Sequence, residues 1–317
     1  MKKILLGIAA LGLVGAVAGS ATVAFYNDVE RSTGNTFTAG GVELRVDSVS
    51  HYNSMICVDV GDTSPLYEWQ PESGFSPLPG HFPEAGTECD GTWAETDLVE
   101  GVHTFFNFLD LKPGDEGEDT ISLHVYDNPA WGQFLVEPVI DRDNTCTDPE
   151  QEAEGDGICQ DPDGDGEIDN YLRFDGWVDQ GAISGFQCGA QGPDNAQCTE
   201  DPTEGDNIYQ DTEGPKFWDN ELIGDLGPFD LAPVFATAYS LENCSSLGEI
   251  DGDTNYGECH GYAEDGRMVA SVTYYFGLAW GLDLQETGND AQTDTYSADL
   301  TFRVEQHRNN PNPFQPI

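Results

Sequence analysis

Apolar side chains recur at every second position in four segments of this chain, with polar or small residues between them. The four segments are residues 42–46, 121–125, 272–278 and 300–304. Because successive side chains of a strand point to opposite faces, this period of two predicts half-buried β-strands with one face on a core. Turn sequences rich in Gly, Pro, Asp and Asn separate the segments. The pattern predicts an all-β fold, a single jelly-roll-like antiparallel β-sandwich, in which only residues 231–241 could form a short helix.

We expect the sandwich domain to extend over residues 41–308. Two stretches inside it, residues 53–97 and 141–220, have few strand-like runs and are expected to be long loop insertions, the second strongly acidic. The tail, residues 309–317, contains prolines that cannot donate to a β-ladder, so it should not extend a central strand.

The first 24 residues have the layout of an export signal. Lys2 and Lys3 precede an uncharged apolar run, and Thr22 and Ala24 offer the small side chains that signal peptidase accepts. We therefore expect residues 1–24 to be a signal peptide and the protein to be secreted. The alternative is a retained membrane anchor, since the uncharged run is about as long as a bilayer-spanning helix.

The chain is extremely acidic, with 59 Asp and Glu against 11 Lys and Arg and a net charge of −48. Such a charge opposes compaction in dilute buffer but is largely screened in molar salt, where the Debye length is about 3 Å. We expect a halophilic protein that works in concentrated brine. Its 16 Phe, 12 Tyr and 6 Trp argue against a disordered acidic chain. The acidity excludes direct binding to nucleic acid, which needs a basic surface.

An even number of cysteines in an exported chain favours disulfides over a metal site. The eight are Cys57, Cys89, Cys146, Cys159, Cys188, Cys198, Cys244 and Cys259. Pairing of neighbours in the sequence would close four loops, but eight cysteines allow 105 connectivities.

A run of alternating carboxylates suggests a calcium loop. Its candidate ligands are Asp161, Asp163, Asp165, Glu167 and Asp169, with Gly166 at the turn. Carboxylates at this spacing can converge on one hard cation. An EF-hand would have Glu at its twelfth position, where this chain has Leu172. The alternative is a solvated acidic loop that simply follows from the composition.

No catalytic motif is present. The sequence lacks H-E-x-x-H, a G-x-S-x-G elbow and a phosphate loop, so we expect no catalytic residues. His103 and His124 are expected to face solvent or to bond a backbone group. The aromatic residues Tyr274, Tyr275, Phe276 and Trp280 are expected in the core or on a face of the sandwich.

Three segments resemble parts of a known family. Residues 24–40, AFYNDVERSTGNTFTAG, are similar to the mature N-terminus of the TasA/camelysin family of exported matrix-fibre proteins. Residues 109–115, LDLKPGD, resemble that family's second landmark, a leucine strand that enters a Lys-Pro-Gly-Asp turn. Residues 292–309 look like the closing strand of haloarchaeal members. The acidic insertions and the eight cysteines depart from the bacterial members.

The resemblance implies a subunit that polymerises head to tail into extracellular or cell-surface filaments. In such a fibre the N-terminal segment, here residues 25–40, adds a strand to the next copy, and Phe25, Tyr26, Val29 and Phe37 would make the contact. Gly40 and Gly41 would act as the joint. Two alternatives remain: a camelysin-like secreted metallopeptidase, or a monomeric surface module that binds calcium or polysaccharide.

Overall fold

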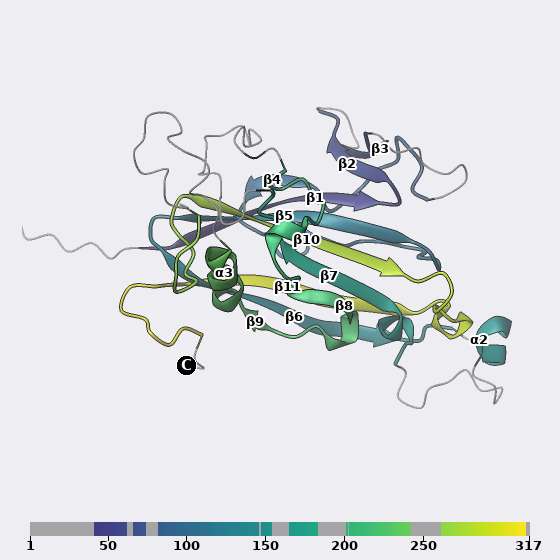
Figure 1. Cartoon of the computed structure of the whole chain (residues 1–317). Coiled ribbons are helices and arrows are strands. Elements are labelled where there is room, and N and C mark those ends of the chain that lie inside the picture. Colours follow the sequence, from purple (N-terminus) through teal and green to yellow (C-terminus); the bar gives the residue numbers. More distant parts are fainter. Residues whose placement is uncertain are drawn as a thin grey trace, which may run out of the picture. The chain divides into compact units, whose positions relative to one another are not determined.

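The computed structural model describes residues 41–61, 66–73, 82–145, 147–153, 165–182, 201, 203–241 and 261–314. These residues belong to one compact unit that begins at Gly40. Antiparallel strands in two sheets make up most of it (Figure 1). The all-β class predicted from the period of two is confirmed.

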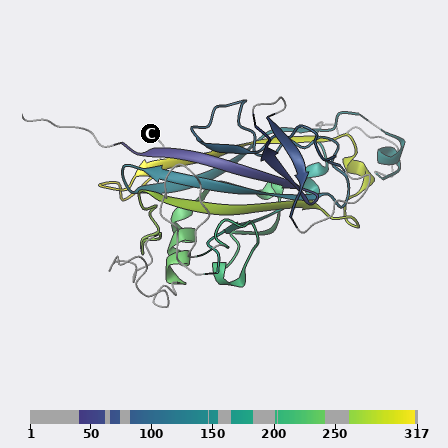
Figure 2. The same ribbon diagram turned by 90° about the horizontal axis from the view of Figure 1, so that it is seen from above.

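The larger sheet has eight strands in the order β3-β2-β1-β5-β10-β7-β8, with β4 pairing β1. Its strands are β1 (Glu43–Tyr52), β2 (Met55–Asp59), β3 (Tyr67–Pro71), β4 (Trp93–Thr96), β5 (Glu116–Tyr126), β7 (Leu172–Val178), β8 (Trp218–Leu222) and β10 (Val272–Leu282). β1 and β5 pair over ten residues of each strand. Figure 2 shows the two strands side by side. β10 pairs the other edge of β5 over nearly the same length.

The smaller sheet has three strands in the order β11-β6-β9. They are β6 (Ala130–Arg142), β9 (Phe229–Asp230) and β11 (Thr295–Gln306). β6 and β11 pair along their whole lengths, with one irregularity beside Ser297. Because β9 contributes only two residues, this sheet is far narrower than the one it faces.

The core lies between the two sheets. Phe302 of β11 stacks on Phe134 of β6 with ring centroids 4.5 Å apart, and Phe134 contacts Trp218 of the larger sheet at 5.3 Å. Tyr274, Phe276 and Trp280 of β10 are buried in the core, as predicted. Fully burying side chains of this size contributes roughly 1.5–3 kcal/mol each.

The smaller sheet does not cover the whole inner face of the larger one. The loop of residues 97–111 lies beside β11, and its phenylalanine side chains cover part of the inner face that the smaller sheet leaves open. Phe105 lies 6.1 Å from Phe302 and 4.9 Å from Trp93 of β4. Phe108 lies 4.8 Å from Tyr52 of β1. The core next to β11 is therefore closed by loop side chains and not by a paired strand of the described chain.

Residues 53–97, expected as an irregular insertion, contain β2, β3 and β4. β2 and β3 pair along five residues and extend the edge of the larger sheet. Cys57 of β2 is joined to Cys89 in the loop before β4, so this predicted pair is confirmed. The sequence pattern did not predict these strands because they are short and lie among turn residues. The other six cysteines lie outside the described residues.

Helices are few in the described chain. The segment expected to be helical forms α3 (Leu231–Ser240), and α2 (Asp148–Ala153) follows β6. The 3-10 helices are η1 (Ile168–Asn170), η3 (Asp211–Glu213), η4 (Ile223–Asp225) and η6 (Asn289–Ala291). None of the helices in the described part of the chain is long and apolar enough to cross a membrane.

Loss of the Cys57–Cys89 bridge should destabilise the β2–β3 edge of the larger sheet. The bridge closes a loop with a sequence separation of 32 residues. In the chain-entropy model a loop of this length is worth about 3–4 kcal/mol. We expect Cys57→Ala with Cys89→Ala to lower the free energy of unfolding by that amount, measured by denaturant titration in molar salt. An unchanged midpoint would show that the bridge contributes nothing to stability.

Candidate functional site

The candidate calcium loop is only partly described. Asp161 and Asp163 lie outside the described residues. Asp165 is exposed, whereas Glu167 and Asp169 are half-buried at the start of η1. These three carboxylates do not form a cluster of converging ligand atoms in the part of the chain that the structure describes. The proposed polymer-contact residues Phe25, Tyr26, Val29 and Phe37 also lie outside it.

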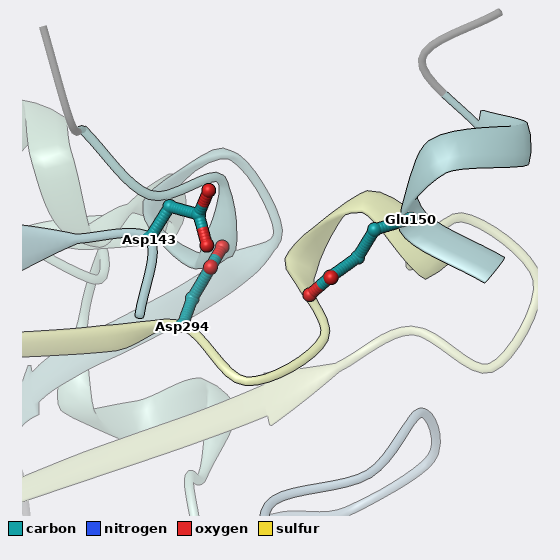
Figure 3. A group of neighbouring side chains, drawn as sticks. All are labelled: Asp143, Glu150 and Asp294. Atoms are coloured by element: carbon teal, nitrogen blue, oxygen red, sulfur yellow. The ribbon is translucent and has the colours of Figure 1, made fainter. Parts of the chain in front are cut away.

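Three other carboxylates do converge. Asp143 follows β6, Glu150 lies on α2, and Asp294 stands immediately before β11. One oxygen from each residue lies within 4.8 Å of the other two. Figure 3 shows the carboxylates of Asp143 and Asp294 facing each other, with Glu150 pointing toward them from the short helix. We call these residues the carboxylate cluster.

Backbone and hydroxyl donors fix the cluster in place. The Thr147 N–H donates to Glu150 Oε2, and the Thr293 hydroxyl donates to Glu150 Oε1 at 3.2 Å. The Glu167 N–H donates to Asp294 Oδ2 at 2.6 Å. Asp143 Oδ1 and Asp294 Oδ1 are shielded from solvent and have no hydrogen-bond partner among the described residues. Two enclosed oxygens thus remain as free acceptors.

The electrostatics of the cluster favour a bound cation. Burial, followed by repulsion from Asp143 and Glu150, raises the pKa of Asp294 to about 6, although the hydrogen bond from Glu167 opposes the shift. No ion pair joins a lysine, arginine or histidine to the cluster in the described chain. Converging carboxylates are typical ligands of a hard cation such as Ca²⁺, which takes six to eight oxygens.

The acidic run and the carboxylate cluster are neighbours. The Gly166 N–H donates to Asp141 Oδ1 at 3.0 Å, and the next N–H, that of Glu167, reaches Asp294. The described end of the run therefore packs against the cluster. The sequence pattern indicated the acidic run but not the clustered ligands, because Asp143, Glu150 and Asp294 share no motif.

Of the two histidines named in the sequence analysis, one has the expected environment and the other does not. His103 Nδ1 accepts the Val99 N–H at 2.8 Å, so the expected backbone bond is confirmed. For His124 the expectation of solvent or a backbone partner is wrong, because the side chain is buried on β5. Its Nε2 lies 2.5 Å from Asp47 Oδ2 of β1, and its Nδ1 lies 3.1 Å from Thr273 Oγ1 of β10. The imidazole links three adjacent strands.

A buried acid pair anchors residues 201–213 to the larger sheet. Asp179, just after β7, accepts the N–H groups of Gly205 and Asn207. Glu213 of η3 accepts those of Gly181 and Gln210. Burial raises the pKa of both carboxyls.

Comparison with known proteins adds no family assignment. The chain matches no protein-family model and no curated protein. The geometry of the described residues and the resemblance of the short N-terminal and central segments are the grounds for a functional proposal.

The acid pair should make the protein less stable as the pH rises. Because both carboxyls have raised pKa values in the folded state, that state retains a proton that the unfolded chain releases above about pH 4–5. The stabilisation from this retained proton is complete below the pKa values of the unfolded chain. It is lost as the pH rises through the pKa values of the folded state. We expect the free energy of unfolding in molar salt to fall between pH 5 and pH 9.

Glu213→Gln isolates this effect from the other acidic groups. The amide cannot ionise, so the variant should show a flatter pH dependence. It should also be about 1–3 kcal/mol less stable at pH 5, because the amide nitrogen cannot accept a backbone N–H. If the stability of the variant and that of the parent protein depend equally on pH, the acid pair is not the cause of the pH dependence.

Proposed function

We propose that this protein is a secreted structural subunit that polymerises head to tail. Each copy would insert residues 25–37 as an added strand beside β11 of the next copy. The observation that carries the proposal is the outer edge of β11, where no strand of the described chain pairs. An unpaired edge presents N–H and C=O groups that an incoming strand can satisfy.

The burial of β11 favours an added strand. Its inward side chains Ala298, Leu300, Phe302 and Val304 pack against the core but remain only partly buried. On the paired neighbour β6, Phe134 and Val136 are fully buried. One further strand beyond β11 would cover the apolar side chains that the narrow sheet leaves half-exposed.

The N-terminal segment suits this position. Phe25, Val29 and Phe37 all have odd numbers, so an extended segment places them on one face. Thirteen residues extend over about 43 Å at 3.3 Å per residue, and the 12 residues of β11 over about 40 Å. The segment therefore has both the pattern and the length needed to pair the whole edge.

The chain enters the sandwich at the end where β11 finishes. The Asn128 side chain donates to the Gly41 carbonyl, and the His307 N–H, just after β11, donates to the Pro129 carbonyl of the same turn. Val42 and Leu44 beside this entry are only partly buried. Gly41, where the described chain begins, therefore lies near the end of β11. Donation of the preceding segment to another copy in one direction would propagate into a filament.

The resemblance to the TasA/camelysin family supports the same proposal, including secretion and a cell-surface or extracellular location. The metallopeptidase alternative has less support. No histidine belongs to a converging group of metal-ligating side chains in the described residues. A monomeric surface module would differ by failing to assemble.

Assembly should depend on the odd-numbered face of the donor segment. We expect Val29→Asn to abolish filaments, because it places an amide among the apolar side chains of β11. The matched change Glu30→Asn lies on the opposite face and should leave filaments intact. Electron microscopy and sedimentation of the secreted protein in molar salt provide the readout.

Two further tests locate the contact. Removal of residues 25–36 should leave a folded, soluble monomer, and a synthetic peptide of residues 25–37 should bind to it. Filaments of unchanged thickness from the truncated protein would overturn the proposal, as would monomers of the parent protein at every salt and protein concentration.

We further propose that the carboxylate cluster binds calcium, because it holds two enclosed, unpartnered oxygens. Bound Ca²⁺ would tie α2 and the start of β11 together. Asp143→Asn with Asp294→Asn should abolish the increase in melting temperature that Ca²⁺ produces in the parent protein. Asp165→Asn with Asp169→Asn is the matched control and should reduce the increase less. An equal increase in melting temperature in the parent protein and the cluster variant would show that calcium does not bind at this site.

A further inference from the structure

A groove with a volume of about 720 Å³ opens at the end of the larger sheet where β1 and β10 finish and β5 and β7 begin. Side chains from all four strands line it, together with residues 207–209 and Lys216. The volume falls in the range of about 300–1,000 Å³ that is usual for small-molecule sites. The groove belongs neither to the carboxylate cluster nor to the edge of β11.

The groove carries exposed apolar side chains. Tyr209 is 37% exposed, Ile208 is 62% exposed and Leu284 is 71% exposed. The Tyr209 ring rests edge-on against buried Trp177 of β7 at 6.0 Å. Its hydroxyl donates to the Gly214 carbonyl at 2.7 Å, so the ring is held in a fixed orientation. A fixed, partly exposed ring offers a flat apolar surface to a ligand.

Many of the charges in the groove are already engaged. Lys216 Nζ pairs with Asp175 at 3.0 Å and lies 5.2 Å from the centre of the Tyr209 ring. Asp115 accepts the Tyr52 hydroxyl and an N–H of the Asn53 side chain at 2.8 and 2.9 Å. The carboxylates of Glu72, Glu116 and Asp283 also line the groove, so its net charge disfavours an anionic ligand.

Burial shifts the pKa values of an acid and a base in the groove toward their neutral forms. Burial, followed by repulsion from neighbouring carboxylates, raises the pKa of Glu118 to about 8. Those neighbours are Glu72, Glu116, Asp179 and Asp206. Burial lowers the pKa of His51 to about 4. Glu118 therefore offers a neutral carboxyl, which can donate as well as accept, and His51 is a neutral imidazole hydrogen-bonded to Asn207.

We infer that this groove binds a neutral saccharide, with the ring of Tyr209 against a sugar face and the polar side chains on its hydroxyls. The hydrophobic C–H face of a sugar matches a fixed aromatic ring. Its hydroxyls match the mixed donors and acceptors of the groove, including the amide of Asn220 and the carboxyl of Glu118. This inference does not depend on polymerisation and would hold for a monomer.

Calorimetric titration of the full secreted chain in molar salt tests the inference. The probes are four neutral hexasaccharides (cellohexaose, maltohexaose, mannohexaose and laminarihexaose), hexagalacturonate as an anion and hexameric chitosan as a cation. We expect at least one neutral hexasaccharide to bind with a Kd below about 1 mM, which corresponds to about −4 kcal/mol. Binding of none of the neutral probes, or of a charged probe alone, would overturn the inference.

Substitutions at Tyr209 test whether the saccharide binds in this groove. Tyr209→Ala should weaken binding at least tenfold, whereas Tyr209→Phe, which keeps the ring and its contact with Trp177, should weaken it less. Tyr239→Ala on α3, outside the groove, is the control and should bind like the parent protein. Melting curves of all variants identify any that fail to fold. If Tyr209→Ala is folded and binds normally, or if Tyr239→Ala loses binding equally, the saccharide is not held in this groove.

Discussion

The pairing of β5 with β1 on one side and β10 on the other is the interaction on which the rest of the structure depends. β5 is hydrogen-bonded along almost its whole length on both edges. Its inward residues Ile121 and Leu123 are buried in the core, whereas outward His124 is held between Asp47 and Thr273. One strand thus organises the core, the outer polar network and, through Glu118 at its start, the groove.

The two sheets are unequal in width, and this inequality shapes the proposed assembly. Eight strands face three, so the inner face of the larger sheet extends beyond β11. The loop of residues 97–111 fills part of that area with phenylalanine side chains, but a loop offers no continuous ladder to the edge of β11. A strand from another copy would complete the backbone pairing as well as the apolar burial, which is why an edge of this kind favours association.

Burial of carboxyl groups recurs throughout this acidic chain, and the environment decides what each group does. Asp119 is fully buried opposite Ser50 of β1, and burial raises its pKa well above the ordinary value. Asp179 and Glu213 anchor a loop through backbone N–H groups, whereas the carboxylate cluster leaves two oxygens without a partner. In molar salt the exposed carboxylates are screened, but these enclosed ones are not, so their protonation and ligands matter for stability.

The sequence by itself determined the all-β class, the strands β1, β5, β10 and β11 and the aromatic core of β10, and it suggested the helix α3 and the Cys57–Cys89 bridge. These features follow from local periodicity and short sequence separations, which remain readable without coordinates. The tertiary structure decided the rest. Asp294 joins Asp143 and Glu150 only because β11 returns beside β6, and His124 is buried only because Asp47 and Thr273 flank it on neighbouring strands. The groove likewise forms where four strand ends meet. Contacts between residues distant in the sequence are set by strand pairing, and the local pattern of a strand does not specify its partner.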